Sequence, residues 1–396
     1  MTTPQFLLMD NAIQNYAWGS TTSISELFDI SNPSNEPQAE IWMGAHPRGC
    51  SKVLLEDKWL RLDALIEQAP ENLLSSTTFQ RFGELPYLFK VLAAAQALSI
   101  QVHPSKEEAE VGFAKENQAN IPLDAAERNY KDPNHKPELV YALTEYHALN
   151  GFRPLSDVIS AFELLNISVL SPLLENLKSA PTEESFQTFF IQLLELDAEK
   201  KPLAVDALLS YAEANKSEPL MALIIELSQS YPGDIGLFSP LMLHYVVLEP
   251  TQAMYLDART PHAYLKGTGL EVMANSDNVL RAGLTPKHID VAELAACTSF
   301  AEKPASTLLV EPQQENGALI YPIPVEDFRF AIYPQPSDER VTANSAEIIF
   351  AIDEQVTLHH DNGETLTLDK GQSAFIPAST AQYNVTSNGR VARVFN

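Results

Sequence analysis

Two polar side chains that stand two residues apart suggest where chemistry takes place. Gln101 and His103 lie in the stretch 98–104, which alternates between apolar and polar residues as a short β-strand does. Successive strand residues point to opposite sides, so Gln101 and His103 project from one face while Ile100 and Val102 take the other. An imidazole and an amide oxygen held on a stiff strand can form half of a metal site.

Two residues elsewhere in the chain are candidates for the remaining ligands of such a site. Glu138 ends the motif His-Lys-Pro-Glu at 135–138, and His262 lies in Thr-Pro-His-Ala-Tyr at 260–264. Two histidines, a carboxylate and an amide oxygen suit zinc, with one position left open for water or substrate. Manganese, iron and cobalt accept similar donors, so ligand type alone leaves the metal open. The spacing alone is equally compatible with a buried histidine that has only a hydrogen-bond partner.

A second group of polar residues lies in the segment 271–287. It places Arg281 and Lys287 close together beside a polar run and two turn signals, in a chain that is otherwise strongly acidic. The planar guanidinium suits a phosphate or a developing oxyanion, and lysine adds a point charge. The alternative is that Arg281 pairs with Asp277 on a solvated loop.

Composition limits the class of protein. The 396 residues, of which 45% are hydrophobic and 20% charged, indicate a globular chain of two or three domains. The net charge of −26 argues against a nucleic-acid-binding surface. We expect no membrane segment, because no leader or bilayer-length apolar run is present. Cys50 and Cys297 give no disulfide framework, so a cytoplasmic location is expected.

Patterning along the chain predicts strands at both ends and helices in the middle. Short helices are predicted at 60–68, 71–82 and 106–116, and a strand at 86–92 leads into the Gln101 stretch. Between 155 and 231 the apolar period becomes helical, and Thr182 is a natural N-cap for one of these helices. Another helix is predicted to begin near Ser217 and to stop before Pro232. After 241, strands return with the spacing of an antiparallel sandwich or small barrel.

The motifs together resemble the type I mannose-6-phosphate isomerase (phosphomannose isomerase) family of the cupin superfamily. The resemblance is carried by segments in family order: 14–19, 39–44, 101–104, 135–138, 261–264 and 276–287. It covers most of the chain and is weakest in the helical block and over the last sixty or so residues. Several long motifs in the same order are far more specific than any one of them.

The resemblance implies a mainly β fold with a helical insertion. It implies a cupin (jelly-roll) catalytic domain over 1–152 and 241–315, an all-α domain over 153–240, and a C-terminal cupin-like β domain over 316–396. It also implies one zinc ion per chain, with Gln101, His103, Glu138 and His262 as its ligands. A monomer is expected. In the C-terminal domain no metal site is expected, because 378–380 (Ala-Ser-Thr) stand where a metal-binding cupin often has histidine.

The implied reaction interconverts mannose 6-phosphate and fructose 6-phosphate through a cis-enediol, within carbohydrate metabolism that includes GDP-mannose supply. The residue treated as catalytic in the family falls on Arg281. The base is left open between Glu271, Lys136 and a zinc-bound hydroxide, and each would need a tuned pKa. The predicted substrate-binding residues, with Ser99 and Lys287 assigned to the phosphate, are Trp18, Glu40, Lys90, Ser99, Tyr264 and Lys287.

Two other functions compete with this prediction. One is a different cupin-fold metalloenzyme, such as an iron dioxygenase, and the other is a non-catalytic regulator that binds sugar phosphate. The remaining histidines that lie near strands or loops are expected to be structural or exposed to solvent: His46, His135, His147, His244 and His288.

Overall fold

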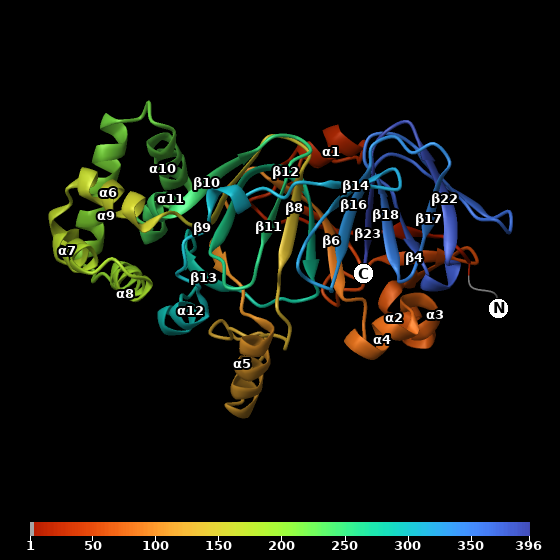
Figure 1. Ribbon diagram of the computed structural model, residues 1–396, viewed down its shortest axis with the longest axis horizontal. Coiled ribbons are helices and arrows are strands. Elements are labelled where there is room, and N and C mark those ends of the chain that lie inside the picture. The colour runs from red at the N-terminus through yellow and green to blue at the C-terminus, as the bar shows by residue number, and fades with distance from the viewer. Residues whose placement is uncertain (1–3) are drawn as a thin grey trace.

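The computed structural model describes residues 4–396; the first three residues of the predicted catalytic domain lie outside the described part. The helices of residues 155–242 gather at one end of the molecule, a strand-rich body forms its middle, and the C-terminal strands form the other end (Figure 1). This is the predicted architecture of a mainly β protein with a helical insertion. The predicted domain limits stay predictions.

The middle of the molecule is a ten-stranded antiparallel sheet that folds back on itself. Its main path runs β10-β9-β12-β6-β3-β2, with β8 and β7 also paired to β12, β11 to β8 and β13 to β7. The strands are β2 (Ala12–Gln14), β3 (Glu40–Met43), β6 (Tyr87–Ala94), β7 (Ile100–Val102), β8 (Glu138–Ala142), β9 (Tyr146–Phe152), β10 (Leu243–Leu248), β11 (Ala253–Leu256), β12 (His262–Ala274) and β13 (Leu280–Gly283).

The long strand β12 organises this body because it changes partners along its length. Its first part pairs with β7 and β9, and its second part pairs with β6 and β8. The register to β9 shifts between Tyr264 and Lys266, which is a β-bulge. Gly267 follows with φ +115°, and a Cβ there would lie 2.4 Å from the carbonyl oxygen of Glu145. Only glycine fits this bend.

The helical end contains the predicted 155–231 block. Thr182 caps its helix by accepting from the Ser185 N–H, and Phe186, Phe189 and Phe190 are buried as the spacing predicts. The helix predicted near Ser217 begins at Pro219 and ends at Ser230. The elements of this block are α6 (Leu155–Leu165), η1 (Ser168–Leu170), α7 (Ser171–Ser179), α8 (Glu183–Leu194), α9 (Lys200–Ala214), α10 (Pro219–Ser230), η2 (Ile235–Phe238) and α11 (Ser239–Met242).

The C-terminal end is a sandwich of a nine-stranded and a four-stranded sheet. The larger sheet recruits three strands from the beginning of the chain, and Leu7 of β1 pairs with Phe375 of β21. In spatial order its strands are β14 (Gln313–Glu315), β15 (Ala318–Tyr321), β16 (Arg329–Tyr333), β23 (Val391–Phe395), β18 (Glu347–Ala351), β21 (Ser373–Ile376), β1 (Leu7–Asp10), β4 (Lys52–Leu55) and β5 (Lys58–Arg61). The smaller sheet contains β17 (Glu339–Thr342), β22 (Gln382–Ser387), β19 (Val356–His359) and β20 (Thr365–Leu368).

Two of the short predicted helices differ in detail from the structure. The prediction at 60–68 began too early, because Leu60 belongs to β5 and the helix starts at Leu62. The single helix predicted at 71–82 is two helices, since Ser75 has φ +81° and its side chain caps the second one. The remaining helices are α1 (Ser23–Phe28), α2 (Leu62–Gln68), α3 (Pro70–Leu74), α4 (Ser76–Phe82), α5 (Lys106–Gln118), α12 (Val291–Cys297), η3 (Ala305–Thr307) and η4 (Ala378–Thr380). Among residues 4–396, no helix is both long enough and apolar enough to cross a bilayer.

The bend at Gly267 predicts a stability effect. Gly267→Ala should lower the unfolding free energy by about 3 kcal/mol, because it combines left-handed strain with a backbone clash. Gly363→Ala is the matched control: it has φ +93° but open space around the added Cβ, so it should cost only about 1 kcal/mol. Urea unfolding of both variants measures the difference. Equal losses would contradict the role given to the close approach at Gly267.

Candidate metal centre and cationic cavity

The register of β7 brings three of the predicted site residues together. Gln101 lies directly opposite His262 of β12 on one side and Arg281 of β13 on the other. Residues directly opposite each other in an antiparallel pair point to the same face of the sheet. The amide, the imidazole and the guanidinium therefore share one face, although they are far apart in sequence.

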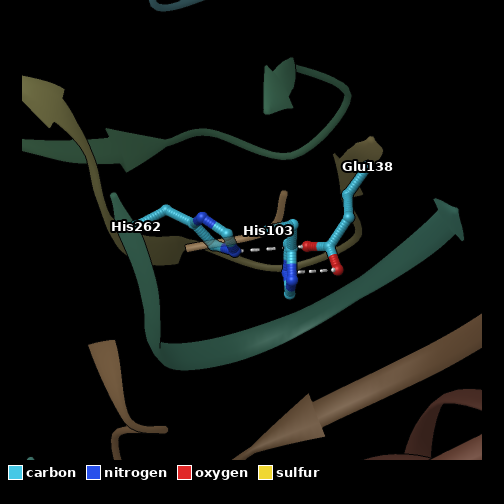
Figure 2. A group of neighbouring side chains, drawn as sticks. All are labelled: His103, Glu138 and His262. Carbon is cyan, nitrogen blue, oxygen red and sulfur yellow. Dashed lines mark ion pairs between the residues drawn. The ribbon is translucent and has the colours of Figure 1, made fainter. Parts of the chain in front are cut away.

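His103, Glu138 and His262 form a buried cluster whose ligand atoms all lie within 4.8 Å of one another (Figure 2). The Glu138 carboxylate faces both rings, with Oε1 3.3 Å from His103 Nε2 and Oε2 3.5 Å from His262 Nε2. Glu138 opens β8 and His262 opens β12, so the sheet itself sets these distances. The three residues are positioned as the ligands of a divalent cation would be.

The two imidazoles are fixed in the tautomer that a metal requires. His103 Nδ1 lies 2.6 Å from the carbonyl oxygen of Asn278, and His262 Nδ1 lies 2.9 Å from that of Thr260. A ring nitrogen that faces a carbonyl must carry the proton, which leaves each Nε2 with a free lone pair. Nε2 of His103 is buried and has no hydrogen-bond partner. An unpaired buried nitrogen beside a carboxylate fits a metal ligand.

The protonation states also favour a metal. Burial lowers the pKa of His103 to about 4, and Lys136 adds to this. Burial acts to raise the pKa of Glu138, but Lys136 and His103 outweigh it, and the pKa lies well below its usual range. At neutral pH the cluster therefore presents a neutral imidazole and an ionised carboxylate, the forms that bind metal.

The carboxylate of Glu138 is held by two more polar partners. Lys136 Nζ lies 3.0 Å from Oε1, and the Tyr264 hydroxyl donates to Oε2 at 2.7 Å. A buried charge is tolerated only when such partners replace water. Lys136 also lines the adjoining cavity, so it connects the cluster to the space where a ligand would lie.

A second buried layer lies beside the cluster on β3, β6 and β12. Lys90 Nζ lies 2.8 Å from Glu271 and 3.5 Å from Glu40, and it faces the Trp42 ring at 5.2 Å from the centroid. Burial opposes the charge of Lys90, but the two carboxylates hold its pKa above the usual value. Burial raises the pKa of Glu271, against the effect of Lys90. With Glu138 and Lys136, the two layers carry one more carboxylate than ammonium group, an excess that a bound cation would offset.

An open cavity of about 410 Å³ adjoins these layers, and its wall is cationic. Besides Lys90 and Lys136 it is lined by Arg48, Lys131, Arg281 and Lys287. The pKa of Lys287 is lowered, first by Arg281, then by burial and by Lys131 and Arg48. Cations that repel one another in an acidic protein are arranged for an anionic ligand.

All the residues selected from the sequence converge on this region. Those that line the cavity are Trp18, Lys90, Ser99, Gln101, Lys136, Arg281 and Lys287. Those buried next to it are Glu40, His103, Glu138, His262, Tyr264 and Glu271. Arg281 lies in the cavity wall, and Asp277 pairs instead with Arg48 at 3.3 Å.

Sequence reasoning missed several residues of the cavity wall. Arg48, Lys131 and Tyr231 reach it only through the fold, and Tyr231 comes from the helical end. His46 was expected to be structural or exposed; it is buried in the wall, 3.5 Å from Asp277 and packed edge-on to Trp42. The other histidines have partners elsewhere or are exposed, as with His135 beside Asp327 and His147 beside Glu145.

The strand-rich body with its buried His–Glu–His cluster defines a cupin-type protein with a candidate metal centre, and comparisons with known proteins narrow this further. Family models match residues 6–155 (phosphomannose isomerase type I, catalytic domain), 170–243 (the helical insertion domain of the same type) and 318–396 (mannose-6-phosphate isomerase, cupin domain). The mannose-6-phosphate isomerase of Escherichia coli (strain K12) is 48% identical over 98% of this chain and 98% of that one. The chain therefore belongs to the type I phosphomannose isomerase family.

Solved structures agree with this assignment. A mutant phosphomannose isomerase from Salmonella typhimurium superposes with a TM-score of 0.95 at 46% identity, and the match covers 99% of this chain and 100% of that one. A zinc-bound mannose 6-phosphate isomerase superposes with a TM-score of 0.94 at 47% identity over the same shares.

His46 predicts a pH dependence of stability. Burial lowers its pKa from 6.5 to about 4, so the unfolded chain binds the proton more readily than the folded one. The contribution of neutral His46 to the unfolding free energy is fully present above pH 6.5 and is lost as the pH falls toward 4. His46→Gln should reduce the loss of unfolding free energy between pH 7 and pH 4.5 by about 2 kcal/mol.

Urea unfolding of the wild type and the variant at both pH values measures this effect. Both proteins keep the same metal centre, so their difference isolates His46. The control is His288→Gln at an exposed position, which should leave the loss of unfolding free energy between pH 7 and pH 4.5 unchanged. If His46→Gln loses as much unfolding free energy between pH 7 and pH 4.5 as the wild type does, burial of His46 is not the cause of the loss.

Proposed function

We propose that the protein is a zinc-dependent aldose–ketose isomerase that interconverts mannose 6-phosphate and fructose 6-phosphate through a cis-enediol. The observation that carries the proposal is the buried His103–Glu138–His262 cluster beside a cavity lined by Arg281 and Lys287. A phosphosugar needs both parts: a centre that acts on its C1 and C2 oxygens, and cations for its phosphate. The mannose-6-phosphate isomerases among its relatives support the same reaction.

His103, Glu138 and His262, together with Gln101 on the facing strand, would hold one zinc ion. Bound there, zinc would supply Lewis acidity toward the sugar oxygens. Gln101 supports this set because it lies opposite His262 and lines the cavity. Tyr264 and Lys136 keep the Glu138 carboxylate oriented through their hydrogen bond and ion pair.

Proton transfer between C2 and C1 is assigned to Lys136. Its Nζ lies at the junction of cavity and cluster, and it would accept the substrate proton as the neutral amine, after its own proton has passed to solvent in the open cavity. Glu271, the other residue considered, is buried against Lys90. We propose that Glu271 and Glu40 fix the position and charge of Lys90, which faces the substrate.

The anionic parts of the substrate are assigned to the cavity wall. Arg281 cannot act as a base, because its guanidinium stays protonated, so it stabilises the developing oxyanion or the phosphate. Lys287 and Ser99 bind the phosphate, and Arg48 and Lys131 add positive potential at the wall. Trp18 forms an apolar part of the wall. This cationic lining favours a phosphosugar over the O₂ of an iron dioxygenase, and a mere regulator would leave the metal cluster without a use.

The cellular setting is part of the same proposal. Cys50 and Cys297 are both free thiols, which suits the reducing cytoplasm. We propose a monomer that serves phosphosugar metabolism, including supply toward GDP-mannose. Sedimentation equilibrium of the zinc-loaded chain tests the monomer.

Removal of the metal predicts a reversible loss of activity. Chelation followed by dialysis should abolish the conversion of mannose 6-phosphate to fructose 6-phosphate, because the substrate oxygens lose their Lewis acid. A coupled assay for fructose 6-phosphate measures the loss, and added Zn²⁺ should restore the rate while Mg²⁺ does not. Sustained turnover by protein shown to be metal-free would refute the proposal.

Arg281 predicts a loss of catalysis that leaves the metal in place. Arg281→Ala should lower kcat/KM by at least about a hundredfold, since it removes a charge that stabilises the transition state. Zinc content, measured by atomic emission, should stay at one ion per chain. Arg329→Ala, an exposed arginine of β16, is the matched control and should keep wild-type kinetics. Near-normal turnover by Arg281→Ala would contradict the role of Arg281 in stabilising the transition state.

A further inference from the structure

One turn of the helical insertion contacts both chain segments that border the phosphate end of the cavity. The turn spans 231–236, from the end of α10 into the first residues of η2. It reaches the segment before β7, which carries Ser99, and the segment after β13, which carries Lys287. These contacts come from side chains that the sequence motifs did not single out: Tyr231 and Asp234.

The Asp234 carboxylate binds the segment after β13 through its backbone. Oδ1 accepts from the N–H of Leu284 at 2.9 Å, and Oδ2 accepts from that of Thr285 at 3.1 Å. Oδ1 also accepts from Gly236 at 2.7 Å, which fixes the carboxylate within its own turn. Thr285 Oγ1 in turn accepts from the Lys287 N–H at 3.1 Å. A short chain of hydrogen bonds thus leads from Asp234 to Lys287.

The backbone at this contact is strained and close-packed. Leu284 is buried with φ +52°, an unfavourable conformation for a leucine, and its N–H is one of those that Asp234 accepts. Gly283 has φ +134°, and a Cβ there would lie 2.6 Å from the Cα of Gly236. Two glycines therefore let the helical turn and the end of β13 touch backbone to backbone. The conformation persists only because the surrounding contacts hold it.

Tyr231 binds the other segment. Its hydroxyl donates to the carbonyl oxygen of Ala97 at 2.5 Å, two residues before Ser99, and its side chain lines the cavity. The same turn thereby sets the separation between the Ser99 segment and the Lys287 segment. Arg281 lies between them on β13, opposite Gln101.

We propose that Asp234 and Tyr231 are positioning residues that hold the phosphate-binding wall in its working geometry, so that the helical insertion acts on substrate affinity. This rests on the proposed function for the identity of the phosphate end. In this role the insertion acts on the groups that bind the anion and not on the reacting carbons. Such preorganisation appears in affinity for phosphate and in KM more than in kcat.

Asp234→Asn tests the proposal with little change in shape. The amide keeps one acceptor oxygen but places an NH₂ group opposite the Thr285 N–H, so the segment loses a hydrogen bond. We expect the affinity of the zinc-loaded enzyme for inorganic phosphate to fall about tenfold, and KM for mannose 6-phosphate to rise in parallel. We expect kcat to stay within about twofold of the wild type. Isothermal titration with phosphate and steady-state kinetics measure these effects.

Asp206→Asn is the matched control, because Asp206 is an exposed aspartate of α9 in the same helical block. It should leave phosphate affinity and KM unchanged. Tyr231→Phe removes only the bond to Ala97 and should weaken phosphate binding about threefold to tenfold. If Asp234→Asn does not fold, Tyr231→Phe decides the question on the same two measurements.

The outcomes separate this proposal from the proposed function. If folded Asp234→Asn or Tyr231→Phe binds phosphate with wild-type affinity, the positioning role is overturned, even where the melting temperature falls. If the wild type binds phosphate but does not turn over mannose 6-phosphate, the proposed function fails. A selective loss of phosphate affinity in Asp234→Asn would still uphold the positioning role.

Discussion

The structure of the site depends on one buried negative charge, the carboxylate of Glu138. Removing a carboxylate from water costs several kcal/mol unless partners replace the solvent. Here Lys136 and Tyr264 supply part of that replacement, and the two imidazoles face the remaining volume through nitrogens that have no proton to give. The Glu138 carboxylate and the two Nε2 lone pairs therefore face a common space that a cation would fill. This arrangement favours the binding of a metal ion.

The geometry around this charge comes from the unusual path of β12. His262 and Tyr264 point inward from its first part, and Glu271 points inward from its second part although its number has the opposite parity. A regular strand would send Glu271 to the other face. The bulge between Tyr264 and Lys266 adds one residue to β12, which shifts the alternation of side chains so that Glu271 faces inward. One irregularity thus lets a single strand serve both the His–Glu–His cluster and the Lys90 layer.

The sequence allowed much of this to be predicted, for reasons that differ between residues. The strand predicted over 98–104 is shorter in the structure, with Gln101 on β7 and His103 one residue beyond its end, but the alternation still placed both residues at the site. The helical period of 155–231 was long enough to be unambiguous. Glu138, His262 and Arg281 came from motifs whose order matched a family, because no spacing rule joins residues so distant. Tyr231 and Asp234 carried no local signal, because their contacts with the segments before β7 and after β13 form only in the folded chain. Ser75 interrupted a predicted helix through a backbone conformation that helix periodicity does not encode.

The pairing of β1 with β21 constrains how the chain reaches its native state. Leu7 is synthesised long before Phe375, yet the two residues are neighbours inside one sheet. Elements of a nascent chain generally fold in the order of synthesis, and contacts between distant segments form slowly. The edge of β1 that pairs with β21 must therefore stay open until β21 has been synthesised, although β4 can pair with the other edge earlier. An unpaired strand edge is prone to aggregation, so β1 is a kind of segment that chaperones protect during synthesis.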